Sequence, residues 1–95
     1  MKEDDDPRCY CYLLECADGS YYTGWTTDPH RRIREHNQGQ GARYTRSRLP
    51  VTLRYLEEQE DQSSAMSREY QIKQLSHEEK AALARSWEDG NKLGN

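Results

Sequence analysis

The sequence predicts a small α/β sandwich of the α+β kind, in which helices flank a mainly antiparallel three-stranded sheet. Two runs rich in tyrosine and apolar residues flank the turn signal Asp18-Gly19, and this pattern is typical of a β-hairpin. A third run, at 51–58, alternates apolar with polar residues and indicates another strand. Helical patterns precede and follow that run, so the expected order is ββαβαα, which favours a single sheet with helices packed on its faces.

Each element has a local signal in the chain. The first helix is expected to begin at Pro29, because Asp28 can cap it and proline fits the first helical position, and to end before Gly39. The pattern Ser76-His77-Glu78-Glu79 is a capping box that starts the last helix. The expected strands are about 10–16, 20–25 and 51–58, and the expected helices are about 29–38, from near 61–63 to 75, and 76–87. A flexible loop is expected at 38–42, and no helix or strand is assigned to 43–48, which follows it.

Ninety-five residues suffice for one domain, which we place at 9–87, between a disordered acidic leader at 1–8 and a flexible tail at 88–95. No apolar run approaches the ~20 residues of a membrane span, and the acidic start is not a signal peptide. Three cysteines without a secretion signal predict reduced, buried thiols in a cytoplasmic protein. We assume a monomer.

The charge is unevenly distributed. The net charge is −3, but residues 28–54 hold seven arginines against two carboxylates, a net charge of +5. A local basic surface of this kind favours phosphate binding despite the acidic total. An ordinary solvated arginine face is the alternative.

Two side chains of the first predicted helix share an edge. Arg32 and His36 are four residues apart, so both can reach one point in space. An arginine there can donate a forked pair of hydrogen bonds to a phosphate. Spacing alone also allows a solvated surface pair.

Glu69 lies inside an apolar stripe of the second predicted helix, between Ala65 and Ile72 and with Met66 beside it, and so should face the sheet. A carboxylate in that position needs a basic partner, a proton or a metal ion. An ion pair with Arg32 or Lys73 is the structural alternative to a metal.

The motifs together resemble those of the GIY-YIG nuclease superfamily, most closely its small stand-alone bacterial members. Tyr10-Cys11-Tyr12 stands where the first signature lies, and Tyr22-Thr23-Gly24 where the second lies. Downstream, Arg32, His36 and Glu69 match the catalytic arginine, the helix histidine or tyrosine, and the metal-binding glutamate. The resemblance covers most of the chain.

This resemblance implies an endonuclease that hydrolyses DNA with one Mg²⁺ or Mn²⁺ ion. Tyr12 would orient or deprotonate the attacking water with support from Tyr22, although the reverse assignment and a simple packing role for both tyrosines remain open. Arg32 would stabilise charge on the phosphate and His36 would assist. Glu69 would hold the ion. We therefore expect these five residues to line one shallow, open surface, with Glu69 and Arg32 on the same side of the sheet.

Further residues are expected to bind DNA. The DNA could be single-stranded or branched, and the expected process is DNA repair or processing. Tyr44 could stack a base or pack on the core. The family's downstream asparagine has no match before Asn91. A non-catalytic nucleic-acid-binding module and a protein-interaction adaptor are the alternative functions. The expected DNA-binding residues are Arg31, Arg34, Arg43, Tyr44, Arg46, Arg48 and Lys73.

Overall fold

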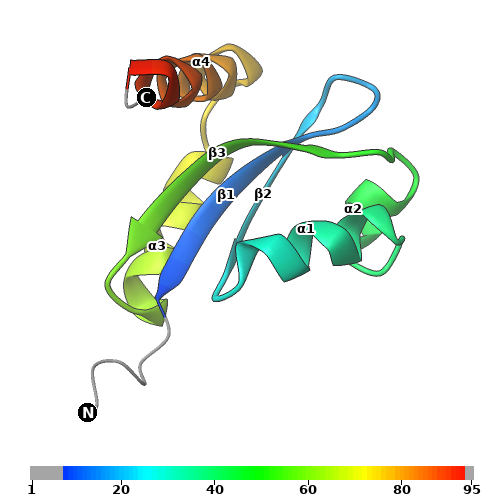
Figure 1. The fold of residues 1–95 in the computed structure, drawn as a ribbon, viewed down its shortest axis with the longest axis horizontal. Coiled ribbons are helices and arrows are strands. Elements are labelled where there is room, and N and C mark those ends of the chain that lie inside the picture. The colour runs from blue at the N-terminus through cyan, green and yellow to red at the C-terminus, as the bar shows by residue number, and fades with distance from the viewer. Residues whose placement is uncertain (1–7, 94–95) are drawn as a thin grey trace.

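A three-stranded antiparallel sheet forms the centre of the fold, with helices on both of its faces (Figure 1). A computed structural model describes residues 8–93, and side chains through residue 90. This confirms the predicted fold class and the order of its main elements. The elements are β1 (Cys9–Glu15), β2 (Tyr21–Thr26), α1 (Pro29–Asn37), α2 (Arg43–Arg46), β3 (Thr52–Gln59), α3 (Gln62–Lys73) and α4 (His77–Leu93).

Two segments differ from the expectation. The segment 43–48, to which the sequence pattern assigns no helix or strand, contains the short helix α2, whose single turn offers no periodicity to detect. The last helix continues to Leu93 instead of ending near Trp87, so helix occupies most of the predicted tail. The predicted acidic leader, apart from Arg8, and the last two residues of the predicted tail lie outside the described residues.

The strand β1 lies in the middle of the sheet, in the order β2-β1-β3, and both pairings are antiparallel. Tyr12 is paired with Gly24 on one side and with Leu56 on the other. A central strand is covered on both faces, which explains why β1 is apolar on both. The outer strand β2 forms one free edge of the sheet.

The two faces of the sheet are covered by different helices. On one face, Cys11 and Leu13 pack with Ala65 and Ile72 of α3, which passes behind the sheet in Figure 1. The opposite face carries Tyr12, Leu14, Cys16 and Val51, and Ile33 of α1 packs against them. The helices α1 and α3 therefore lie on opposite sides of the sheet.

The helix starts follow the predicted capping chemistry. The carboxylate of Asp28 accepts from the backbone N–H of Arg31 at 3.2 Å, and Pro29 opens α1. Before α4, the Ser76 hydroxyl accepts from the backbone N–H of Glu79 at 3.1 Å, and the Glu79 carboxylate accepts from that of Ser76 at 2.8 Å. A cap of this kind contributes about 1 kcal/mol to helix stability.

The three cysteines are free and buried, and they are divided between the two faces as the strand alternation predicts. One member of the predicted stripe on α3 is wrong, because Met66 is 49% exposed while Ala65 and Ile72 are buried. No helix between residues 8 and 93 is long and apolar enough to cross a membrane.

Candidate active site

Tyr12 brings a phenol from the central strand to the free edge of the sheet. A side chain at Gly24, its partner on β2, would place a Cβ atom 2.5 Å from the Tyr12 oxygen. The tyrosine ring therefore lies against the backbone of the outer strand, and only a glycine permits so close an approach. Only 1% of Tyr12 is exposed to solvent.

His36, in the last turn of α1, is fully buried and has a hydrogen-bond partner on each ring nitrogen. Its Nε2 lies 3.0 Å from the Tyr12 oxygen, and its Nδ1 lies 2.9 Å from the hydroxyl oxygen of Thr45 on α2. Backbone at Gly41 lies so close to the imidazole that any side chain there would clash with it. The histidine is thus held between a strand, a loop and a short helix.

Both groups of this pair are neutral near pH 7. Burial and, to a lesser extent, the charge of Arg32 together lower the pKa of His36 to about 4, against the opposing effect of Glu35. Burial is also the main cause that raises the pKa of Tyr12 to about 12; Arg32 opposes this rise, while Tyr22 and Glu69 add to it. The fold therefore provides a neutral imidazole beside a neutral phenol.

Arg32 extends from α1 beside this pair, and its side chain is half-buried. Its guanidinium donates to the Glu35 carboxylate at 3.0 Å and to the carbonyl of Gly41 at 3.2 Å. These two bonds hold it in one orientation. The loop residue Gly41 contacts both Arg32 and His36, so it helps to position two of the five expected site residues.

Tyr22 completes the cluster from β2. Its ring centroid lies 5.2 Å from that of His36 and 6.1 Å from that of Tyr44, on which it stacks at 25°. The guanidinium carbon of Arg48 lies 3.9 Å from the centroid of the Tyr44 ring. Tyr44 is partly exposed, so it stacks at the margin of the site and is not part of the buried core.

Glu69 contradicts the expected arrangement. It faces the sheet, with 19% of its side chain exposed, but α3 lies on the opposite face from Arg32. Its carboxylate pairs with Lys73 at 3.4 Å, which is one of the two alternatives drawn from the sequence. The predicted open surface is also wrong for Tyr12 and His36, which are buried.

The charge of Glu69 nevertheless has an effect on Tyr12. The negative charge of Glu69 contributes, after burial, to the raised pKa of Tyr12. Four expected site residues therefore form one cluster (Tyr12, Tyr22, Arg32 and His36), while Glu69 lies outside it and pairs with Lys73.

Comparison with known proteins identifies the family of the chain. The family model described as the GIY-YIG catalytic domain matches residues 8–82, a span that holds all five residues. The chain belongs to the GIY-YIG family. This is a superfamily of nucleases.

The relatives of this GIY-YIG domain are small proteins of similar length, from archaea as well as bacteria. A UPF0213 protein of Halobacterium salinarum is 60% identical over 74 residues, which cover 78% of this chain and 96% of that one. A solution NMR structure of a UPF0213 protein of Bacillus halodurans has a TM-score of 0.52 at 46% identity, with 82% and 83% of the two chains covered. Another, of a protein from E. faecalis, has a TM-score of 0.58 at 39% identity, covering 87% and 88%.

The donor set of this GIY-YIG domain fits a metal ion only in part. No group of three or more His, Cys, Asp or Glu side chains that could hold an ion occurs in the part of the chain that the structure describes. Glu69 supplies one carboxylate beside the cation of Lys73. Mg²⁺ is commonly held by one or two carboxylates, waters and substrate phosphates, so Glu69 suits a weak site that substrate completes.

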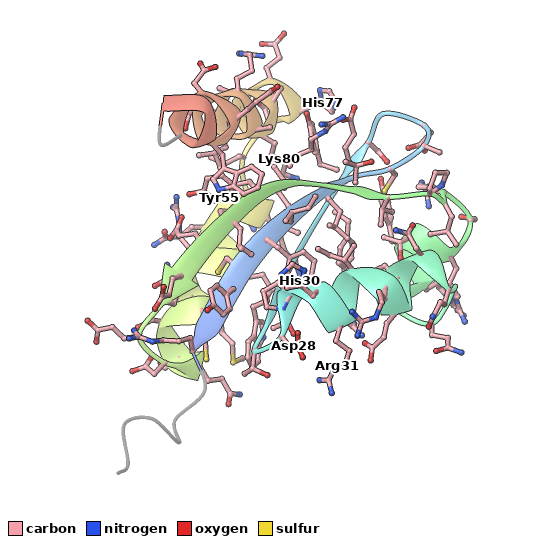
Figure 2. The ribbon with its side chains drawn as sticks, in the orientation of Figure 1. Asp28, His30, Arg31, Tyr55, His77 and Lys80 are labelled. Carbon is pink, nitrogen blue, oxygen red and sulfur yellow. The ribbon has the colours of Figure 1, made fainter. Side chains whose placement is uncertain are left out.

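The expected DNA-binding arginines divide into two groups. Arg31 projects away from the sheet (Figure 2) and lies 3.8 Å from Glu35, while Arg48 is bound to Asp18 at 3.0 Å. Arg54, in the same basic segment, is paired with Glu15 at 2.8 Å. Three of the expected DNA-binding arginines form no ion pair with any described residue and remain available for phosphate: Arg34, Arg43 and Arg46.

Sequence reasoning missed three contributors to the site: Thr45, Gly41 and Glu35. Thr45 lies in an arginine-rich segment in which nothing in the sequence indicates a buried hydroxyl. Gly41 was one of two glycines in a loop, and only the fold shows that the backbone approaches His36 there. For Glu35 the sequence does hold a signal, because its position three residues after Arg32 indicates a helical pair.

Proposed function

We propose that this GIY-YIG domain is a metal-assisted endonuclease that hydrolyses phosphodiester bonds in DNA. The observation that carries the proposal is the buried hydrogen bond between Tyr12 and His36, with Arg32 beside it. Such a pair is an acid–base unit, and an arginine next to it can neutralise a phosphate. Membership of a nuclease superfamily supports the same conclusion.

In the proposed reaction the Tyr12 oxygen takes a proton from the attacking water while its own proton passes to Nε2 of His36. The hydroxide oxygen forms a bond to phosphorus, and the bond to the leaving oxygen breaks with its electron pair. His36 then returns its proton toward the leaving oxygen, through Tyr12 or solvent. The concerted transfer suits two neutral groups, because a free phenolate would be costly at this buried position.

Arg32 would meet the phosphate that reacts. Its bond to Glu35 holds it in the resting state, and an incoming phosphate competes with that carboxylate for the same guanidinium. A charge contact that strengthens as the phosphate gains negative charge lowers the barrier more than it tightens binding. Tyr22, half-buried beside His36, would shape the entrance to the pair.

Glu69 would hold the Mg²⁺ or Mn²⁺ ion, and Lys73 would exchange its partner for a phosphate. When bound, such an ion polarises the phosphate and stabilises the leaving oxygen. Replacement of the Glu69–Lys73 ion pair by ion and substrate is plausible energetically, because a half-exposed pair of this kind contributes at most about 1 kcal/mol.

DNA would lie against the unpaired arginines on α1 and α2 that flank this entrance. Contacts of this type carry no sequence information and give binding that weakens with salt. A domain this small can cover only a short length of nucleic acid, so single-stranded or branched DNA in repair or processing is the substrate class we propose.

A second function, a nucleic-acid-binding module without turnover, is favoured by one observation. Glu69 lies across the sheet from Arg32 and is already paired with Lys73. A domain that had lost its metal site would keep the arginines and the fold. It would bind DNA with the same dependence on salt, but it would not cleave.

A cleavage assay separates these functions. Single-stranded, duplex and branched DNA are incubated with wild-type protein, with and without Mg²⁺ or Mn²⁺, and with Glu69→Ala, Arg32→Ala and Tyr12→Phe proteins purified in parallel. Metal-dependent cleavage by the wild type and its loss in all three variants supports the nuclease. Salt-sensitive binding without cleavage supports the binding module, and absence of both excludes the two proposals.

A further inference from the structure

The proton positions around His36 follow from Thr45, whose side chain is fully buried. The hydroxyl oxygen of Thr45 lies 3.1 Å from the carbonyl oxygen of Ala42, three residues earlier, and 2.9 Å from Nδ1 of His36. A carbonyl oxygen can only accept a hydrogen bond, whereas a hydroxyl has one proton to donate and can also accept. The Thr45 proton therefore goes to Ala42.

This leaves one arrangement for the imidazole. Because the Thr45 proton is committed to Ala42, its oxygen must accept from His36, so Nδ1 carries the proton. A neutral imidazole has only one N–H group, so Nε2 is bare and accepts from the phenol of Tyr12. The chain of bonds then runs in one direction, from Tyr12 through His36 and Thr45 to Ala42.

We propose that Thr45 is a positioning residue that fixes the Nδ1-protonated tautomer of His36 and so leaves Nε2 free to take the Tyr12 proton. The proposal rests on the proposed function in that the reaction uses this proton. The opposite tautomer would put two protons between the imidazole and the phenol or would reverse the bond, and Tyr12 could no longer pass a proton to His36.

Packing restricts the other way in which the ring could rearrange. The backbone of Gly41 lies against the Nδ1 side of the imidazole and leaves no space for even a Cβ atom. Tyr22 lies beside the same ring, with its centroid 5.2 Å away. A ring flip that exchanged the two nitrogens would have to displace these neighbours, so the Thr45 hydroxyl acts on a histidine whose ring plane is already set.

The test compares two substitutions at position 45. Thr45→Ser keeps the hydroxyl, whereas Thr45→Val keeps the shape and removes it. Thr23→Val is the matched control, because Thr23 is also buried, its hydroxyl has no partner among the described residues, and it faces α3 on the other side of the sheet. Long-range proton–nitrogen NMR spectra of ¹⁵N-labelled protein near pH 7 show directly which ring nitrogen of His36 is protonated.

Wild type, Thr45→Ser and Thr23→Val should all show a protonated Nδ1 and a bare Nε2, while Thr45→Val should shift toward Nε2 protonation. Single-turnover cleavage should fall by about 10²-fold or more in Thr45→Val, as expected for loss of one acid–base contribution, with unchanged DNA affinity. Thr45→Ser should retain most of the rate. Serine lacks the methyl group of threonine, so a near wild-type rate in Thr45→Ser would show that the hydroxyl matters and not the packing of the side chain.

A protonated Nε2 in the wild type overturns the proposal, and so does a Thr45→Val protein that keeps both the wild-type tautomer and the wild-type rate. If Thr45→Val does not fold, the wild-type and Thr45→Ser spectra still decide the tautomer. If the wild type shows the expected tautomer but never cleaves DNA, the proposed nuclease function fails while the role of Thr45 in setting the tautomer stands.

Discussion

The phenol oxygen of Tyr12 lies 3.0 Å from Nε2 of His36, and both side chains are shielded from solvent. One comes from the central strand and the other from the helix that covers it. The hydrogen bond therefore joins the sheet to the helix that covers it, in addition to any part in the chemistry. The half-buried Arg32 and Tyr22 lie beside it and are the members of the cluster that solvent reaches.

Removing the phenol oxygen tests the chemistry most directly. Tyr12→Phe keeps the ring but leaves Nε2 of His36 without its partner. Single-turnover cleavage should fall by about 10²- to 10⁴-fold while DNA affinity, measured by fluorescence anisotropy, stays unchanged. Unfolding in urea should show a loss of about 1–3 kcal/mol for the unpaired buried nitrogen. Retained cleavage would exclude Tyr12 as the base and leave Tyr22 as the candidate.

Freeing Arg32 should strengthen binding. Glu35→Gln removes the carboxylate that holds the guanidinium and repels an approaching phosphate. We expect DNA affinity to rise several-fold at low salt, and the gain to shrink as salt screens the charge. Glu58→Gln is the control, since that carboxylate lies on β3 and pairs with Arg8. Equal changes in both variants would mean that only net charge matters.

The metal should depend on Glu69. Glu69→Gln should abolish the response of cleavage to Mg²⁺ or Mn²⁺, and with DNA bound it should abolish any rise in melting temperature caused by the ion. Glu78→Gln, an exposed carboxylate in the first turn of α4, should behave as wild type. An unaltered metal response in Glu69→Gln would place the ion elsewhere.

The unpaired arginines should carry most of the DNA affinity. Each phosphate contact that is lost should reduce the slope of log K against log salt by about 0.7 to 0.9. Replacing Arg34, Arg43 and Arg46 by glutamine should therefore flatten the salt dependence markedly. Arg54→Gln should change it little, because Arg54 is paired with Glu15. A similar slope for the triple variant and the wild type would locate the DNA on another surface.

Stability should decline in mild acid because of His36. Burial lowers its pKa to about 4 in the folded protein, against about 6.5 in the unfolded chain. Between these values the unfolded state binds more protons, so the stabilising contribution is complete above pH 6.5 and is lost as the pH falls toward 4. The loss is on the order of 3 kcal/mol at most. Urea unfolding of wild type and His36→Gln at several pH values should show a weaker pH dependence in the variant.

The sequence was sufficient for the sheet, because turn chemistry and alternation identify a hairpin and a third strand within about one residue of their bounds. It was insufficient for α2, since a helix of one turn has no period. The end of α4 was also missed, because Gly90 and Asn91 favour a helix end but do not terminate this one.

The site was predictable in its members more than in its layout. Helical spacing correctly placed Glu69 toward the sheet, but spacing cannot show which face of the sheet the helix covers. That choice depends on how the connection after β3 crosses the sheet, and here it puts Glu69 opposite Arg32. Burial of His36 was also invisible, because a histidine beside arginines in a polar helix resembles a surface residue.

Tyr12 packs in the same buried cluster as Leu14 and Val51. Selection for the stability of the fold and selection for catalytic rate therefore act on the same residue. Replacing both members of a buried polar pair by apolar groups of similar shape can be neutral or stabilising. A double change such as Tyr12→Phe with His36→Leu could thus yield a sturdier protein with no chemistry. Two substitutions would therefore suffice to give a stable variant without catalytic activity. A screen that selects for thermal stability alone would enrich such variants.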